Sequence, residues 1–187
     1  MNTATLRGPR VILRPWRLPE DLEPLFAING DPAAMRFFPE TMDRAGSDDW
    51  GRRIAADCAS RDHGFWALEL PGSGLVGVVG IKPVPFEADF TPGIEIGWRI
   101  ATAYQRQGLA EEAARLALAY GFGPARLEDI VAFTPPANEP SWRLMEKLGM
   151  TRRGQFDHPG LAPGHRLRPH LLYGITRAEW VASRLEE

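Results

Sequence analysis

The stretch between positions 94 and 122 changes its hydrophobic pattern midway, and the rest of the chain is organised around it. From Ile94 to Ile100, apolar side chains alternate with Glu95, Gly97 and Arg99, as in a strand that buries one face. From position 109 the apolar side chains recur at helical spacing instead; they are Leu109, Ala113, Leu116, Ala117 and Tyr120. The pattern predicts a strand over 94–100 that runs through a short loop into a helix ending near 122.

Similar patterns predict the remaining elements. Strands are expected over residues 11–15, 64–70, 75–81, 129–134, 151–156 and 170–176, with a hairpin turn at 71–74. Helices are expected over 19–30, 140–149 and 177–185, together with a short helix after Asp31-Pro32 and a longer one capped by Ser47-Asp48-Asp49. This order predicts an α/β (α+β) fold in which helices flank a mixed sheet of about seven strands.

Composition narrows the class of protein. The chain has 187 residues, of which 44% are hydrophobic and 25% charged, so residues 1–187 are expected to form a single domain with its own core. A net charge of −2 gives no electrostatic reason to bind nucleic acid or membranes. We see neither a signal-peptide pattern nor an apolar segment of bilayer-spanning length, so a soluble cytoplasmic protein is expected.

Cysteine and histidine usage argues against a metal or disulfide framework. Cys58 is the one cysteine, which excludes an intramolecular disulfide and a multi-cysteine metal site. It follows Ile54 by four residues on a predicted helix, so we expect it in the core. The four histidines lack metalloprotease spacing, so no metal is expected in catalysis.

The loop between the central strand and helix is the first candidate binding site. It reads Gln105-Arg106-Gln107-Gly108-Leu109-Ala110, with small residues where the helix begins. Such a turn directs free backbone N–H groups at one point, and the helix dipole adds about half a positive charge there. The turn therefore suits a phosphate or pyrophosphate. From the physics alone, a tight turn that binds nothing explains the pattern equally well.

The loop and several other segments resemble one enzyme family. Gln105-x-x-Gly108-x-Ala110, after a strand ending at Ile100, resembles motif A of the GNAT superfamily of N-acetyltransferases. Ordered segments along nearly the whole chain are similar to its RimJ/RimL-type branch; they are 11–16, 20–22, 31–38, 95–100, 138–150 and 170–180. Residues 83–92 and 157–169 match least. The resemblance implies the GNAT fold, with a central, mostly antiparallel sheet.

The resemblance also implies a cofactor and the residues that bind it. The cofactor would be acetyl-coenzyme A, with the backbone of Trp98, Arg99 and Ile100 beside its pantetheine arm. The pyrophosphate would lie on main-chain N–H groups of the turn formed by Gln105, Arg106, Gln107, Gly108, Leu109 and Ala110. Asn138 would hydrogen-bond the pantetheine, and Ser141 would face the thioester sulfur. Helix capping by Asn138 and a filler role for Ser141 are the structural alternatives.

The implied chemistry is direct attack of a neutral amine on the thioester, without a covalent enzyme intermediate. Met145 stands where many family members have a tyrosine acid, so Ser141, or water held by it, is the candidate proton donor. Phe133 occupies a position that carries glutamate in some relatives. Glu95 is therefore the candidate base; pairing with a neighbouring arginine is the competing explanation.

The acceptor is expected to be a protein or peptide N-terminus, as in ribosomal-protein acetylation, or a small-molecule amine. Weak provision for a base favours an amine of low pKa, such as an α-amine near 7.7–8.0. Acidic residues expected near the acceptor are too few to favour a polycation; they are Glu40, Asp43, Asp48 and Asp49. Specificity is expected in residues 31–47, 83–92 and 157–169, and the proline-rich 83–92 is either a substrate wall or a long connection.

Two further expectations follow from the resemblance and its departures. Met145 and Phe133 leave open a second function, a catalytically silent coenzyme A-binding module that senses or regulates. Analogy with the family adds a homodimer.

Overall fold

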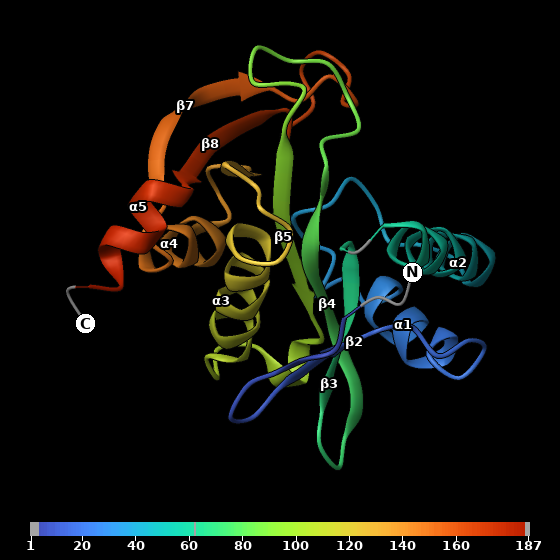
Figure 1. The fold of residues 1–187 in the computed structure, drawn as a ribbon. Coiled ribbons are helices and arrows are strands. Elements are labelled where there is room, and N and C mark those ends of the chain that lie inside the picture. Colours follow the sequence, from blue (N-terminus) through green and yellow to red (C-terminus); the bar gives the residue numbers. More distant parts are fainter. Residues whose placement is uncertain (1–3, 62, 186–187) are drawn as a thin grey trace.

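One mixed sheet forms the centre of the molecule, with helices on both of its faces (Figure 1). The computed structural model describes residues 4–61 and 63–185. Within them the sheet has eight strands in the order β1-β2-β3-β4-β5-β6-β8-β7, antiparallel throughout except for β5 and β6. The expected α/β (α+β) fold with a mostly antiparallel sheet between helices is thereby confirmed, with eight strands where about seven were expected.

The elements follow the predicted order closely. The strands are β1 (Leu6–Arg7), β2 (Ile12–Arg14), β3 (Phe65–Leu70), β4 (Gly74–Pro83), β5 (Ile94–Ile100), β6 (Asp129–Thr134), β7 (Thr151–Asp157) and β8 (Pro169–Thr176). The helices are α1 (Leu22–Asn29), α2 (Arg44–Ser60), α3 (Leu109–Phe122), α4 (Glu139–Lys147) and α5 (Arg177–Ser183), with a 3₁₀ turn over Thr102–Tyr104. The added strand β1 is only two residues long, too short to show an alternating pattern.

The alternation along β5 decides which helices lie on which face. Ile96 and Ile100 are buried in the main core together with Ala113 and Ala117 of α3. The opposite side of β5 faces the layer of α1 and α2, where a side chain at Gly97 would meet the ring of Phe65 and where Arg99 reaches Asn29. Figure 1 shows α3 and α4 on one side of the sheet and α1 and α2 on the other. The strict two-residue period of β5 therefore separates two layers.

The connection from β5 through α3 to β6 opens the sheet. The two strands run parallel and register at Glu95 with Val131, whereas β4 stays paired with β5 from Ile94 to Ile100. Beyond Glu95, β5 therefore presents an edge that β6 does not cover. Because unpaired strand edges expose backbone N–H and C=O groups, this divergence creates a place where an extended ligand can pair with the chain.

Helix boundaries in the first quarter differ from the predictions. The helix expected from position 19 begins only at Leu22, because the Asp21 carboxylate accepts hydrogen bonds from Arg14 and the backbone N–H of Arg17 instead of capping. The predicted cap Ser47 lies inside α2, which starts at Arg44 and is capped by Asp43 through the N–H of Gly46. Both corrections concern polar side chains that had more than one available partner.

The prediction of a short helix after Asp31-Pro32 is also wrong. The segment forms a run of turns, with the N–H of Met35 bonded to the Asp31 carbonyl and the N–H of Phe38 bonded to the Met35 carbonyl. The Asp31 carboxylate accepts hydrogen bonds from Ala33 N–H and the Thr102 hydroxyl. These contacts hold a turn, not a regular helix, beside the end of β5.

The proline-rich connection 83–92 is irregular, as predicted, but its aromatic residues are not exposed. Phe86 and Phe90 are half-buried and pack around Phe133 and Phe156. No residue of 83–92 lines the cavity that lies along the open edge of β5. In the described residues no helix combines the length and the apolar character needed to cross a bilayer.

Candidate active site

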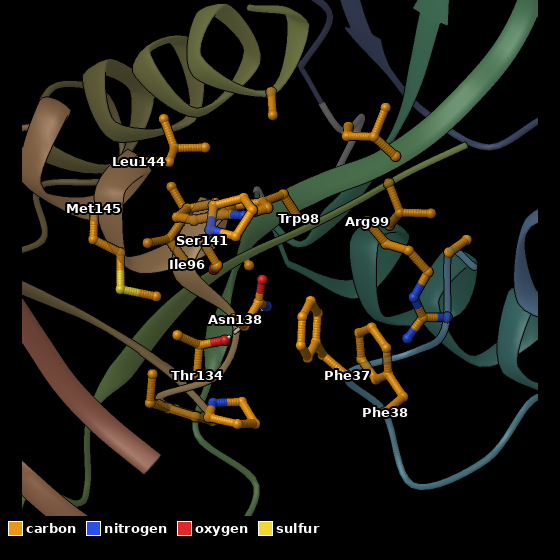
Figure 2. Close-up of a pocket in the computed structure, with 18 of the residues that line it drawn as sticks. Phe37, Phe38, Ile96, Trp98, Arg99, Thr134, Asn138, Ser141, Leu144 and Met145 are labelled. Carbon is orange, nitrogen blue, oxygen red and sulfur yellow. Dashed lines mark hydrogen bonds between the residues drawn. The ribbon is translucent and has the colours of Figure 1, made fainter. Parts of the chain in front are cut away.

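A cavity of about 1130 Å³ follows the open edge of β5. It is lined by residues of β5, of the loop that leads into α3, of the start of α4, and of the turns over residues 33–39. Figure 2 shows Trp98, Asn138 and Ser141 in its middle, with Phe38 and Arg99 farther along. Most of the predicted site residues are thus brought to one space.

The turn before α3 has the geometry that the sequence predicted for it. Gly108 is the N-cap residue with a φ of 78°, and Arg106 has a φ of 60°. No side chain caps the helix, so the first N–H groups of α3 are left for solvent or a ligand. Gly108, Leu109 and Ala110 line the cavity. The left-handed conformation at Gly108 explains the glycine, since a side chain would be strained there.

The polar side chains around this turn hold its shape. Gln105 donates from Nε2 to the carbonyl of Ile100 at 2.9 Å, and Gln107 donates from Nε2 to the carbonyl of Ala103 at 3.0 Å. Arg10 donates from Nη1 to the Gln107 carbonyl at 2.9 Å. Gln105 and Arg106 line the cavity, while Gln107 is not among its lining residues. The turn therefore offers backbone groups to a ligand and uses its glutamines as internal braces.

Asn138 does not cap α4 with its side chain. Its Nδ2 donates to Thr134 Oγ1 at 2.9 Å, across the break between β6 and α4 (Figure 2). The capping alternative is therefore wrong, and a half-buried amide lines the cavity with its orientation set by a buried threonine. Ser141 lies in the first turn of α4 and also lines the cavity. The sequence reasoning missed the role of Thr134.

Glu95 is paired, though not with an arginine as the competing explanation held. Lys82 Nζ lies 3.1 Å from its carboxylate, which is 12% exposed. Burial raises the pKa of Glu95, and the nearby ammonium opposes that rise. Both residues line the cavity. A buried carboxylate of raised pKa is suited to accepting a proton, and the ion pair shows that it also has a structural partner.

The position of the missing tyrosine and glutamate is filled by apolar groups. Met145 is buried and lines the cavity, and it has no proton to donate. Phe133 belongs to an aromatic cluster that includes His158 and His170, whose ring centroids lie 5.1 Å apart. Both histidines line the cavity. Burial lowers the pKa of each, which favours neutral imidazoles at pH 7.

These histidines were not identified as site residues from sequence. His170 is buried and its Nδ1 lies 3.1 Å from the carbonyl of Arg168, which fixes the ring. The sequence pointed only to the wider segment: residues 157–169 were expected to carry specificity, and Leu161 and Leu167 of that segment line the cavity. Only the pairing of β7 with β8 brings both rings together.

Cys58 has the core role expected of it. It is 1% exposed, its Sγ lies 3.3 Å from the carbonyl of Phe65, and burial raises its thiol pKa to about 12. A thiol in that state is a poor nucleophile. Within residues 4–61 and 63–185, no group of His, Cys, Asp and Glu side chains is arranged to hold a metal ion.

Comparisons with known proteins agree with this architecture. Residues 10–151 match the acetyltransferase (GNAT) domain family. YnaD of Bacillus subtilis, described as an uncharacterised N-acetyltransferase, is 41% identical over 86 residues, which is 46% of this chain and 50% of YnaD. Spermidine N(1)-acetyltransferase of Escherichia coli is 30% identical over 153 residues, covering 79% of this chain and 76% of that enzyme.

The solved structures include an acetyltransferase of the GNAT family from Bacillus anthracis. It superposes with a TM-score of 0.77 at 26% identity, and the match covers 94% of this chain and 99% of that one. The conserved feature across these comparisons is the fold and the donor chemistry, because GNAT acetyltransferases take their acetyl group from acetyl-CoA.

Proposed function

This chain belongs to the GNAT family of acetyltransferases, and from that premise we propose that it transfers an acetyl group from acetyl-CoA directly to a primary amine. The family and the names of the relatives indicate an acetyl-transferring enzyme. The observation that carries the proposal for this site is the divergence of β5 from β6 after Glu95, which opens the cavity along a free strand edge.

The residues that surround this edge fit coenzyme A in chemistry. The uncapped start of α3 behind Gly108 suits the pyrophosphate, since free N–H groups and the helix dipole both favour an anion. The edge of β5 at Trp98 and Ile100, with the Asn138 amide opposite, suits the amide groups of the pantetheine arm. When bound, acetyl-CoA supplies the acetyl group as an activated thioester.

Two side chains are proposed to move protons. Ser141 is the donor that protonates the departing sulfur, because Met145 beside it on α4 cannot. Glu95 is the acceptor of a proton from the incoming amine, directly or through water, because burial raises its pKa toward the range of a useful base. Neither role needs a covalent enzyme intermediate, which agrees with the buried, protonated Cys58.

The finer assignment to the RimJ/RimL-type branch rests on the ordered motifs from 95–100 and 138–150. It would make a protein or peptide N-terminus, or a small amine, the acceptor. The relative from Escherichia coli is named for spermidine, which keeps small amines in the panel. A homodimer is proposed by analogy with the family, and a cytoplasmic location is proposed from the sequence pattern alone.

The experiment is thiol release from acetyl-CoA with the purified protein against N-terminal peptides, polyamines, aminoglycosides and amino acids. A parallel thermal shift tests acetyl-CoA binding without requiring the right acceptor. Turnover with one amine class, together with a stabilising shift, is expected. A shift without turnover by any amine would favour the coenzyme A sensor instead, and absence of both would contradict the cofactor assignment.

A further inference from the structure

Arg99 carries a positive charge that no carboxylate in the described part of the chain balances. Its Nη1 donates to the side-chain oxygen of Asn29, and its Nε is buried without a hydrogen-bond partner. Burial lowers its pKa to about 10, so the guanidinium is still charged at pH 7. An ionised group removed from water without a counter-charge is costly unless something else supplies that charge.

Arg99 is half-buried, and the fully buried Arg14 shows how a guanidinium is paired elsewhere in this protein. Arg14 has a side chain that is 5% exposed, and it pairs with Asp21 at 2.7 Å and with Glu69 at 2.5 Å. Arg99 is held by different contacts. Its guanidinium carbon lies 4.1 Å from the ring centroid of Phe38 and 4.7 Å from that of Trp50.

The two rings contact the guanidinium, and the N–H groups along its edge remain able to donate hydrogen bonds. The aromatic contacts and Asn29 fix the orientation of the group, which lowers the entropy lost when a ligand binds. Arg99, Phe38 and Trp50 all line the cavity that also contains Ser141. In Figure 2, Arg99 and Phe38 lie to one side of the view, and Asn138 and Ser141 lie nearer its middle.

The surrounding charges favour an anion at that end. Arg36 and Lys82 line the same cavity as Arg99. Glu95 lies there too, but Lys82 already pairs with it. The cavity's other carboxylates lie on α3 and α4 and are also paired, Glu111 with Arg115 and Glu139 with Arg143. Glu40, Asp43, Asp48 and Asp49 do not line it.

We propose that the edge of Arg99 binds a carboxylate of the acceptor, so that the substrate is an amine that also carries a carboxylate, in the manner of an amino acid or a short peptide. The planar fork of a guanidinium matches a carboxylate better than any other common group. A polyamine would instead bring positive charge toward Arg99 and Arg36. The inference rests on the proposed acetyl transfer and names its acceptor class.

The test compares amino acids with their amides, which differ in the carboxylate. The wild type is expected to give a higher kcat/KM with the acids than with the amides or with spermidine. Arg99→Met is expected to lower the acid-to-amide ratio about 10- to 100-fold, the usual worth of a charge-assisted hydrogen-bonded pair. Arg99→Lys keeps the charge without the fork and should fall between. Arg52→Met, on an exposed arginine of α2 outside the cavity, is the matched control.

A second measurement does not depend on turnover. N-acetylated amino acids and the corresponding amides are added to the wild type and to Arg99→Met, and the melting temperature is recorded. A shift with the carboxylates alone, lost in Arg99→Met and kept in Arg52→Met, supports the inference. Equal use of acids and amides by the wild type, or equal shifts with both, would overturn it. Failure of acetyl transfer itself is recognised separately, by no thermal shift with acetyl-CoA and no thiol release with any amine.

Discussion

The two ends of the cavity are built in different ways. At the α3 end, the groups offered to a ligand are backbone N–H groups held by a left-handed glycine and braced by Gln105 and Gln107. At the other end, the surface is made of side chains from α2, β5 and the turns between α1 and α2, with Arg99 at its centre. The first end depends on the local conformation of one turn, and the second depends on side chains that the tertiary structure brings together from distant segments.

The difference fits the proposed division of the site, in which the common acetyl donor binds at the α3 end and the acceptor binds at the other end. A backbone cradle needs only a few small residues at fixed spacing, so many sequences can form it. A side-chain surface changes with each substitution in the segments that supply it. Four substitutions test this difference between a backbone cradle and a side-chain surface; their expected effects range from about 100-fold to about threefold.

Ser141→Ala removes the proposed proton donor from the donor end. We expect kcat to fall about 100-fold, the lower range for loss of a general acid, with acetyl-CoA binding retained. Thiol-release kinetics and the thermal shift with acetyl-CoA measure the two effects separately. Ser73→Ala, in the turn between β3 and β4, is the control. A variant with undiminished kcat would remove Ser141 from the mechanism.

Gly108→Val places a branched side chain at a φ of 78° in the turn before α3. We expect acetyl-CoA to bind about 10- to 100-fold more weakly, because the turn must rearrange and its N–H groups lose their alignment. Gly72→Val carries a similar strain at a φ of 85° in a turn without neighbours and should leave the affinity unchanged. Calorimetric titration with coenzyme A checks both; equal losses would mean that general destabilisation is responsible.

Glu95→Gln tests whether Glu95 acts as a base, through the pH dependence of kcat/KM. Burial raises the pKa of the Glu95 carboxyl, so its deprotonated form, needed in a base, is lost at a higher pH than for an ordinary glutamate. We expect kcat/KM at pH 7 to fall about tenfold and the acidic limb of the wild-type profile to disappear. The contribution of Glu95 to folding stability changes with pH in the opposite direction to its activity as a base. That contribution is fully present below the unfolded-state pKa of 4.5 and is lost as the pH rises through the raised pKa of the folded state. An unchanged profile would leave Glu95 as the partner of Lys82 alone.

Thr134→Val should have the smallest effect. It removes the oxygen that accepts a hydrogen bond from Asn138 while keeping the shape of the buried side chain. We expect KM for acetyl-CoA to rise about threefold to tenfold, since one neutral hydrogen bond contributes about 1 kcal/mol. Thr134→Ser, which restores the hydroxyl, should recover most of the loss. If both variants behaved alike, packing and not orientation of Asn138 would be the cause.

The regular elements were predictable where one physical requirement dominated. The two-residue period of β5 and the helical stripe of α3 each satisfy a single buried face, and both were placed correctly. Pro140 and Gly149 placed α4 to within two residues at each end, since the helix spans Glu139–Lys147. Predictions failed where a short polar side chain could choose between local and distant partners. Asp21 bonds Arg14 instead of capping α1, for example.

The candidate site divides along the same line. The sequence determined the conformation of the turn before α3, because a left-handed turn at Gly108, free N–H groups and a small residue at Ala110 are consequences of local covalent geometry. Only the tertiary structure decided that Asn138 points to Thr134, that Glu95 pairs with Lys82, and that the half-buried Arg99 has no carboxylate partner among the described residues. Those facts depend on which side chains from distant segments share a space, and long-range packing of that kind leaves no fixed spacing in the chain.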